Sequence, residues 1–235
     1  MASRPAARRI SYNRGMGIAR HLERRLERLV DGMSASLFRG TMHPVDLANR
    51  LVRHADLSAT ETVVGPAIPN IYRVAVNPAD VPNSSAVEDL ERELTVTLES
   101  TAADRGWRLD GPVGITLTTD EGVRAGSIAC QTENRPGPVH PWAQLIDPRI
   151  GALLPVAPNR ALVGRAEECD VVVDDSAVSR HHAVLFREGG KAWLADLGSS
   201  NGSTLNGLAV PDAAVMLHAG DAVTFGPATF SFRVL

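Results

Sequence analysis

Residues 196–207 read DLGSSNGSTLNG, and every residue of this stretch except its two leucines is small or turn-forming. The stretch contains Gly198-x-Ser200-x-Gly202, which matches the short pattern around the nucleophilic serine of many hydrolases. A stretch of this kind can also form a loop that holds a ligand without performing any chemistry. The sequence on either side decides between these two interpretations.

A hydrolase of this type carries its serine on a sharp turn between a strand and a helix. Residues 191–196 (KAWLAD) predict the strand, but Gly207 and Pro211 follow the serine-glycine stretch and do not allow a helix to begin there. Asp212 and His218 come next, although in an all-β setting their order alone is weak evidence for a catalytic triad. We therefore expect no enzyme and no catalytic residue.

The C-terminal part of the chain has the pattern of an all-β domain. From about residue 150 onward, short apolar runs such as ALVG, AVLFRE, KAWLAD and AVTFG alternate with turns, and helical periodicity disappears. Gly189-Gly190 separates AVLFRE from KAWLAD, as expected for a two-residue hairpin in which both positions take positive φ. Many short strands at regular spacing predict a β-sandwich over residues 150–235.

In a sandwich, loops gather at the two ends, so segments far apart in sequence can meet there. Gly164-Arg165 ends one predicted strand, Ser179-Arg180 precedes another, and Asn201 lies in the serine-glycine stretch. Together these segments offer two guanidinium groups, hydroxyls, an amide and backbone N–H groups. Such a set of donors matches a phosphate monoester, which carries about −1.5 to −2 charges and three acceptor oxygens.

The combination of GR at 164–165, SRHHA at 179–183, the serine-glycine stretch and GDAVTFG at 220–226 resembles forkhead-associated (FHA) domains. These are β-sandwiches that bind phosphothreonine peptides. The resemblance implies that six residues contact the phosphopeptide: Arg165, Ser179, Arg180, Ser199, Ser200 and Asn201. It also implies structural roles for four residues of the motif: Gly164, His182, Gly202 and Asn206. The family usually has threonine where this chain has Ser203, at a position that supports the loop.

The two adjacent histidines, His181 and His182, raise the possibility of a metal site. No third ligand stands at a suitable spacing, and His182 is more simply a buried histidine that ties loops together. We therefore expect neither a metal nor a cofactor.

The N-terminal half alternates between helical and strand periodicity. Helices are predicted at 17–30, from Pro44 to about 55 and from Ser85 to near 106, and strands at 71–76, 113–119 and 127–132. These elements predict an α+β domain over residues 15–133, preceded by a flexible basic arm at 1–14. Four prolines, at 136, 138, 141 and 148, predict a semi-rigid linker over residues 134–149.

The run from GIARHLERRLERL at 17–29 through HPVDLANRLVRHAD at 43–56, followed by PNIYRVAVNP at 69–78, resembles the N-terminal domain of actinobacterial FhaA-like proteins. In that family an FHA domain follows, and the proteins act in Ser/Thr-kinase signalling linked to cell-wall synthesis. The resemblance implies a non-catalytic phosphothreonine-dependent adaptor. Its partner would be a phosphothreonine-containing protein, either a Ser/Thr-kinase substrate or the kinase itself.

Charge is unevenly distributed along the chain. Residues 1–28 hold eight arginines and two glutamates, a net charge of +6, and the remainder holds 16 basic and 25 acidic residues, a net charge of −9. The basic segment leaves open a nucleic-acid-binding function regulated through the FHA domain. Against it, Tyr12 is the only aromatic residue of the segment, so aromatic residues do not alternate with its arginines, and Glu23 and Glu27 interrupt its basic face.

A third possibility is that the predicted helix at 17–30 docks on a membrane surface. Its apolar stripe is narrow and has no aromatic residues, which favours packing onto its own domain instead. The stripe consists of Ile18, Leu22, Leu26 and Leu29.

Cys130 and Cys169 have no CxxC spacing, which predicts free thiols in a reducing compartment. The sequence has no long apolar run for a membrane span and no apolar N-terminal stretch for export. We therefore expect a cytoplasmic protein that reaches a membrane only through a partner.

Overall fold

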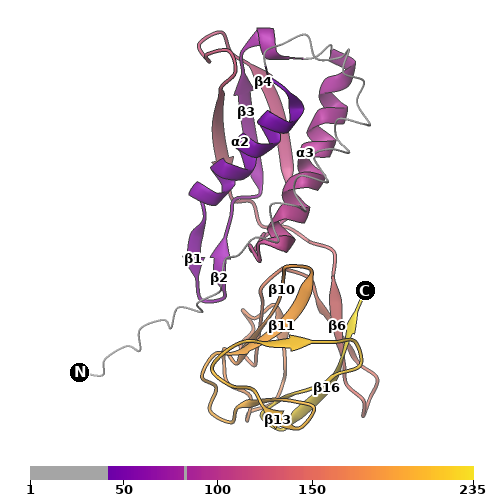
Figure 1. Ribbon diagram of the computed structural model, residues 1–235. Helices are drawn as coiled ribbons and strands as arrows, with labels where there is room; N and C mark the ends of the chain where they lie inside the picture. The colour runs from indigo at the N-terminus through magenta and orange to yellow at the C-terminus, as the bar shows by residue number, and fades with distance from the viewer. Residues whose placement is uncertain (1–41, 82–83) are drawn as a thin grey trace, which may run out of the picture. The chain divides into compact units, whose positions relative to one another are not determined.

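The computed structural model describes residues 42–81 and 84–235 (Figure 1). The predicted basic arm at 1–14 and the predicted helix at 17–30 lie outside the described residues. By their contacts, the described residues divide into two units. The sandwich unit contains residues 140–235 and 61–66, and the N-terminal unit contains residues 42–60 and 67–139.

The N-terminal unit has the predicted α+β fold. Its main elements are α2 (Pro44–Leu57), β3 (Ile71–Val76), the 3-10 turn η2 (Pro78–Asp80), α3 (Ser84–Asp104), β4 (Gly114–Thr119) and β5 (Ile128–Glu133). Each predicted helix and strand that lies in the described residues is confirmed, with ends that differ by at most two residues.

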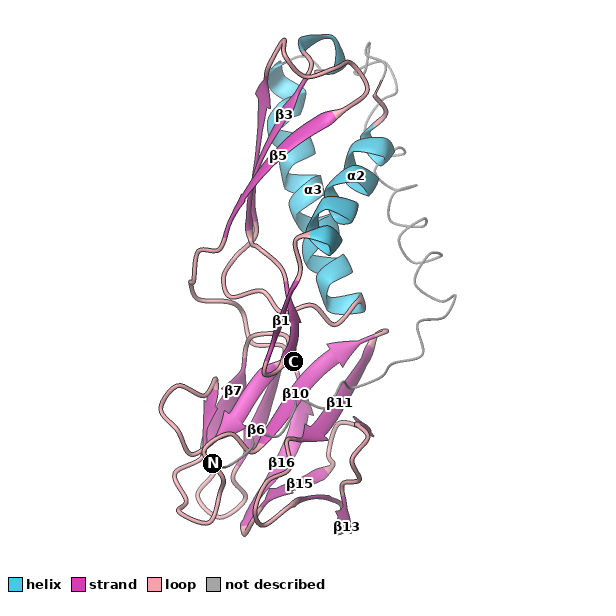
Figure 2. Cartoon of the chain, turned by 90° about the vertical axis from the view of Figure 1, so that its left-hand side faces the viewer, coloured by secondary structure: helices cyan, strands magenta, loops and turns pink. Residues whose placement is uncertain are grey.

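The three strands of this unit form one sheet in the order β4-β3-β5. β3 and β4 are parallel because the 21-residue helix α3 connects them, whereas β5 returns antiparallel to β3. Figure 2 shows α2 and α3 together on one face of the sheet. The alternation along β3 buries Tyr72, Val74 and Val76 and exposes Arg73, so the core lies between the sheet and the helices.

Both helices bury the stripe that their spacing predicts. In α2 the buried stripe includes Ala48, Leu51, Val52 and Ala55. In α3 it includes Leu90, Leu94 and Leu98, each at most 1% exposed. Apolar spacing at three and four residues therefore predicts which face of each helix meets the sheet.

The sandwich unit is built from two β-sheets, as the sequence predicts. One has the order β14-β11-β10-β8-β9, and the other has the order β13-β12-β15-β16-β6-β7. The strands are β6 (Ala143–Ile146), β7 (Leu153–Val156), β8 (Ala161–Gly164), β9 (Val171–Val172), β10 (Ala183–Glu188), β11 (Lys191–Asp196), β12 (Ser203–Leu205), β13 (Leu208–Ala209), β14 (Val215–Leu217), β15 (Ala222–Phe225) and β16 (Ala228–Val234). Side chains from both sheets, including Leu185, Leu194, Phe225 and Phe232, form a common core and are fully buried.

The hairpin between β10 and β11 forms at the predicted glycines. Gly189 and Gly190 have φ of 61° and 72°, and Glu188 pairs with Lys191 across the turn. Both glycines thus adopt the left-handed conformation that a tight two-residue turn requires.

The sandwich begins earlier than the predicted boundary at residue 150. Strand β6 lies inside the predicted linker at 134–149, yet it pairs with β16 over four residues. Pro141 and Pro148 flank β6 without interrupting it, so the density of prolines around this short strand conceals it in the sequence.

A second unpredicted element is the hairpin of β1 (Thr60–Thr62) and β2 (Gly65–Ala67), whose residues 61–66 belong to the sandwich unit. There the Arg160 guanidinium is 3% exposed, lies 4.5 Å from the centre of the Phe186 ring, and donates to the Val64 carbonyl at 3.2 Å. The Glu188 carboxylate, 3.1 Å away, neutralises this buried charge. No helix among the described residues has the length and apolarity needed to cross a membrane.

Candidate functional site

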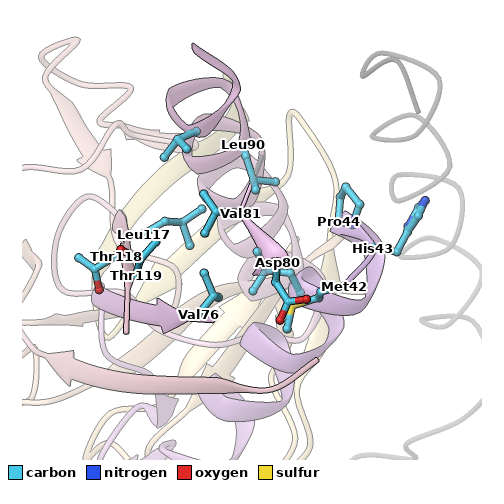
Figure 3. Close-up of a pocket in the computed structure, with 12 residues that line it drawn as sticks. Met42, His43, Pro44, Val76, Asp80, Val81, Leu90, Leu117, Thr118 and Thr119 are labelled. Atoms are coloured by element: carbon cyan, nitrogen blue, oxygen red, sulfur yellow. The ribbon is translucent and has the colours of Figure 1, made fainter. Parts of the chain in front are cut away.

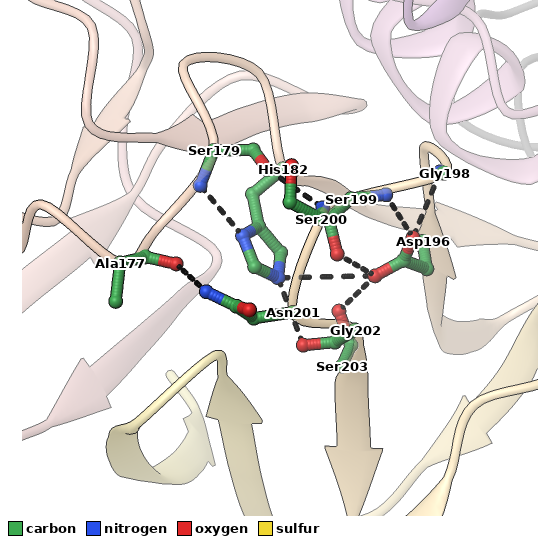
Figure 4. Close-up of polar contacts among 10 residues, drawn as sticks. All are labelled: Ala177, Ser179, His182, Asp196, Gly198, Ser199, Ser200, Asn201, Gly202 and Ser203. Atoms are coloured by element: carbon green, nitrogen blue, oxygen red, sulfur yellow. Dashed lines mark hydrogen bonds and ion pairs between the residues drawn. The ribbon is translucent and has the colours of Figure 1, made fainter.

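Three loops of the sandwich unit meet at one end of it, and Figure 4 shows the contacts between the second and the third. They connect β8 to β9, β9 to β10 and β11 to β12. The first two are joined by the Arg165 N–H, which donates to the Ser179 carbonyl at 3.0 Å. The second and third are joined by the Ser200 N–H, which donates to Ser179 Oγ at 3.0 Å, and by Asn201 Nδ2, which donates to the Ala177 carbonyl at 2.8 Å. The convergence expected for a sandwich is therefore present.

His182 holds two of these loops together from inside. Its side chain is 0% exposed, its Nδ1 accepts from the Ser179 N–H at 3.1 Å, and its Nε2 lies 3.1 Å from the Gly202 carbonyl. Because Nδ1 accepts a hydrogen bond, the proton of the neutral ring is on Nε2 and is donated to Gly202. Burial lowers the pKa of His182 and keeps the ring neutral. The structure thus gives His182 a structural position.

Asp196 organises the third loop, although no motif in the sequence marks it as a site residue. Its carboxylate accepts from the Gly198 N–H at 2.8 Å, the Ser199 N–H at 2.7 Å, the Ser199 hydroxyl at 2.7 Å and the Ser203 hydroxyl at 2.5 Å. Burial alone would raise the pKa of Asp196, but the bonds from Ser203, Ser199 and Gly198 outweigh it and the pKa is lowered. Its position two residues before Gly198 is the sequence signal for such a turn.

Ser203 supports the third loop, and Asn206 ties the turn after β12 to the turn before β15. The serine that departs from the usual threonine donates to Asp196, so the hydroxyl function of this position is retained. Asn206 has φ of 51°, and its amide bonds to the Asp221 carboxylate and the Ala222 N–H, both at 2.9 Å. Both residues therefore contribute to the framework.

Gly164 permits the close approach of the first two loops. It is buried, and a Cβ at this position would lie 2.1 Å from the Arg180 carbonyl oxygen and 3.0 Å from Cys169 Sγ. Only glycine fits there without moving the backbone. Gly202 is at a turn with φ of 71° and has open space around it.

Several hydrogen-bond donors at this end remain available to a ligand. Arg165 is exposed, and among the described residues no carboxylate pairs with its guanidinium. Ser179 Oγ accepts from the Ser200 N–H, so its own proton can be donated outward. Ser200 and Asn201 are exposed. The Ser199 hydroxyl differs from these because it already donates to Asp196.

Arg180 lies at the edge of the loops and has a carboxylate partner that its sequence position does not predict. Its Nη2 lies 3.3 Å from Glu168 Oε1, and His181 Nε2 lies 3.1 Å from the same oxygen. All three side chains are well exposed, so this ion pair is screened by solvent and a doubly charged anion can replace Glu168 as the partner of Arg180.

The geometry around Ser200 does not support nucleophilic catalysis. The stretch Gly198-x-Ser200-x-Gly202 leads from β11 into strand β12, whereas a nucleophile elbow leads into a helix. His182 cannot serve as a general base, because its two ring nitrogens are bonded to the Ser179 N–H and the Gly202 carbonyl. The same two bonds leave no lone pair of His182 for a metal ion.

Comparisons with known proteins agree with this architecture. The model of the FhaA N-terminal domain matches residues 20–131, and the model of the FHA domain matches residues 161–226. Similar proteins include the ABC transporter ATP-binding/permease protein Rv1747 of Mycobacterium tuberculosis, 37% identical over 45% of this chain and 11% of that one. They also include the glycogen accumulation regulator GarA of Mycolicibacterium smegmatis, 43% identical over 27% of this chain and 39% of that one.

Among solved structures, Mycobacterium tuberculosis EmbR in complex with a low-affinity phosphopeptide is 34% identical. The match covers 39% of this chain and 24% of that chain, with a TM-score of 0.38. The chain thus spans well under half the length of these relatives. The order of the two matched domains, an FhaA N-terminal domain followed by an FHA domain, is the one that the residue motifs predict.

Proposed function

We propose that this chain is a non-catalytic adaptor that binds phosphothreonine-containing proteins in Ser/Thr-kinase signalling. The observation that carries the proposal is the set of donors at the loop end of the sandwich. Arg165, Ser179 and Asn201 come from three different loops, yet backbone and side-chain bonds of 2.8–3.0 Å hold those loops together. A phosphate group needs donors of this kind at fixed positions.

In this proposal each donor has a role. Arg165 and Ser179 contact the phosphate, with Ser200 beside them, and Arg180 exchanges Glu168 for the phosphopeptide. Asn201 bonds to the peptide backbone, because its amide has a second N–H and a carbonyl oxygen beyond the N–H that it donates to the Ala177 carbonyl. Ser199 contributes as a wall of the pocket beside the phosphate, because its hydroxyl is engaged by Asp196.

The partner is a phosphothreonine-containing protein, either a substrate of a Ser/Thr kinase or the kinase itself, and the family resemblance extends the proposal to signalling linked to cell-wall synthesis. Cys130 and Cys169 are both free thiols, which is consistent with the reducing environment of the cytoplasm, where we place this adaptor. The nucleic-acid alternative rests on residues 1–28, outside the described residues, and neither matched family model describes a nucleic-acid-binding domain.

The test is calorimetric titration of the full chain with a degenerate peptide library that carries phosphothreonine at one fixed position. The same library with unmodified threonine serves as its control. We expect binding only with the phosphorylated library, and equal binding of both libraries would overturn the proposal.

The non-catalytic part of the proposal is tested separately. A fluorophosphonate probe, which reacts with activated serines, is expected not to label the protein. Labelling that is present in the native chain and lost in Ser200→Ala would show a nucleophilic serine and contradict this part.

A further inference from the structure

The N-terminal unit contains an apolar pocket of about 400 Å³ (Figure 3). Most of its walls are aliphatic side chains from α2, α3 and the ends of β3 and β4. They include Met42, Leu47, Val76, Val81, Leu90 and Leu117. A hollow of this size and character is in the range of sites that hold a ligand or part of a partner.

The chemistry of the pocket favours aliphatic side chains as its contents. The carboxylate that lines it, Asp80, is 5% exposed and accepts from the Gly126 N–H at 2.7 Å. The Glu91 carboxylate of α3 is similarly engaged, because it accepts from the Leu117 N–H at 2.7 Å. Both carboxylates thus bond to backbone N–H groups of the unit. The surface that remains for an occupant of the pocket is largely apolar.

The chain itself carries a segment of matching character close to the pocket. The described residues begin at Met42, which is part of the pocket wall. Residues 17–30, with their aliphatic stripe, are separated from Met42 by only the eleven residues 31–41. An extended chain of that length spans at most about 40 Å, so the stripe is tethered within reach of the pocket. The matched FhaA N-terminal domain begins at residue 20, inside this segment, which makes the segment part of the same domain.

The distribution of charge also favours binding of residues 17–30 to the pocket. Residues 1–30 carry eight arginines and two glutamates, a net charge of +6, whereas residues 42–139 carry 8 basic and 14 acidic residues, a net charge of −6. Exposed acidic residues follow directly on pocket-lining residues: Glu88 follows Val87, and Asp120 follows Thr119. An apolar pocket in a unit of net negative charge complements a segment that is apolar on one face and rich in arginine on the other.

We propose that this pocket is the intramolecular docking site of residues 17–30, with the stripe of Ile18, Leu22, Leu26 and Leu29 directed into it and the arginines outside it, where they interact with the net negative charge of the unit. The occupant is tethered to the wall of the pocket, so docking costs little entropy of association. The pocket is then a completed part of the domain core and not an open ligand site.

Photo-cross-linking in the full chain tests this arrangement. p-Benzoylphenylalanine replaces Thr119, which is exposed at the rim of the pocket, and mass spectrometry maps the products. We expect cross-links from position 119 to residues 17–30. The matched control places the photoreactive residue at Thr116, on the same strand but on the opposite face of the sheet, and should give none of these products.

Mixing ¹⁵N-labelled with unlabelled protein distinguishes the possible occupants. Cross-links within one isotopic species support the proposal. Mixed pairs would assign the pocket to a second copy of the chain, and cross-links to a co-purifying protein would assign it to a partner; either result overturns the proposal. Absence of any product with residues 17–30 overturns it as well.

A variant of the segment provides a second measurement. Leu22→Asp combined with Leu26→Asp should lower the yield of the cross-link from position 119 at least tenfold, because charged side chains do not enter the apolar pocket. Arg24→Gln, on the other face of the predicted helix, should preserve the cross-link. An unchanged yield in the double variant would contradict the proposed docking site.

Discussion

The two units of this chain offer binding surfaces of opposite chemistry. At the loop end of the sandwich, exposed donors such as Arg165 and Asn201 stand on a framework of buried bonds through His182 and Asp196. The pocket of the N-terminal unit is lined mainly by aliphatic side chains, and its carboxylate, Asp80, bonds to the backbone. The donors of the first suit directed hydrogen bonds, whereas the walls of the second suit apolar groups.

This difference explains why only one of the two surfaces is visible in the sequence. A phosphate site needs particular residue types at particular places, because hydrogen bonds depend on donor, distance and angle. The wall of an apolar pocket can be built from leucine, valine or methionine with similar success, since the hydrophobic effect is not directional. Polar sites therefore leave motifs, and apolar pockets do not.

The largest expected effect concerns the framework of the sandwich. Gly164→Ala should lower the free energy of unfolding of the sandwich by about 3 kcal/mol or more, because the new methyl group would overlap the Arg180 carbonyl. Denaturant unfolding in a Trp107→Phe background, which leaves only Trp142 and Trp193 of the sandwich as reporters, measures this change.

Gly190→Ala is the matched control for that substitution. Gly190 also has a positive φ, but nothing lies within 4 Å of the added methyl group. Its cost should stay near 1 kcal/mol, the cost of placing alanine at positive φ. Equal costs for the two variants would show that the close approach at Gly164 is not important for stability.

The next effect concerns the donors that the framework supports. Arg165→Ala should weaken the binding of a phosphothreonine peptide by about 2–4 kcal/mol, a factor of thirty or more in Kd, because a charge-assisted contact is lost. Arg165 is exposed, so the stability of the sandwich should not change.

Calorimetric titration measures the affinity, with Lys191→Ala as the control. That substitution removes the same charge at the far end of strands β10 and β11, across the hairpin from the loops. Unchanged affinity in folded Arg165→Ala would remove Arg165 from the proposed site.

A smaller effect tests whether the polar surface also has an apolar part. We expect phosphothreonine to bind roughly tenfold more tightly than phosphoserine, since one buried methyl contributes about 0.8 kcal/mol and the stiffer χ1 of threonine a similar amount. Titration with two peptides that differ only in this methyl group measures the ratio. Equal affinities would mean that no apolar pocket lies beside the phosphate at Ser199–Asn201.

The smallest expected effect is a pH dependence of sandwich stability. Burial lowers the pKa of His182 below its ordinary value of 6.5, so below that pH the unfolded chain takes up a proton that the folded chain does not. The free energy of unfolding should therefore be greatest above about pH 6.5 and fall as the pH decreases, by at most about 1.4 kcal/mol per pH unit for this one group.

Unfolding measured between pH 7.5 and 5 in the native chain, His182→Gln and His181→Gln checks this expectation. The slope should shrink in His182→Gln, which removes the buried ring, and His181→Gln is the control because it replaces the neighbouring, exposed histidine. A slope that is unchanged in His182→Gln would contradict a neutral, buried ring.

Local sequence patterns predict many of the helices and strands. The periodicity of α2 and α3, the alternation in β3 and the two hairpin glycines each predict an element that the structure contains, because each depends on residues close together in sequence. The short strands β1 and β6 are not predicted. Strand β6 pairs with the distant strand β16 and is surrounded by prolines. Residues 61 and 62 of strand β1 belong to the sandwich unit, which lies far along the chain.

The sequence by itself determined which residue types stand in each loop, and thereby the donors Arg165, Ser179, Arg180, Ser200 and Asn201 that suit a phosphate. Only the tertiary structure decided that Asp196 accepts hydrogen bonds from Ser199 and Ser203, that Glu168 pairs with Arg180, and that the N-terminal unit contains a pocket. The physical reason is that side-chain chemistry is a property of single residues, whereas a hydrogen-bond partner or a cavity exists only when the folded backbone brings distant segments together.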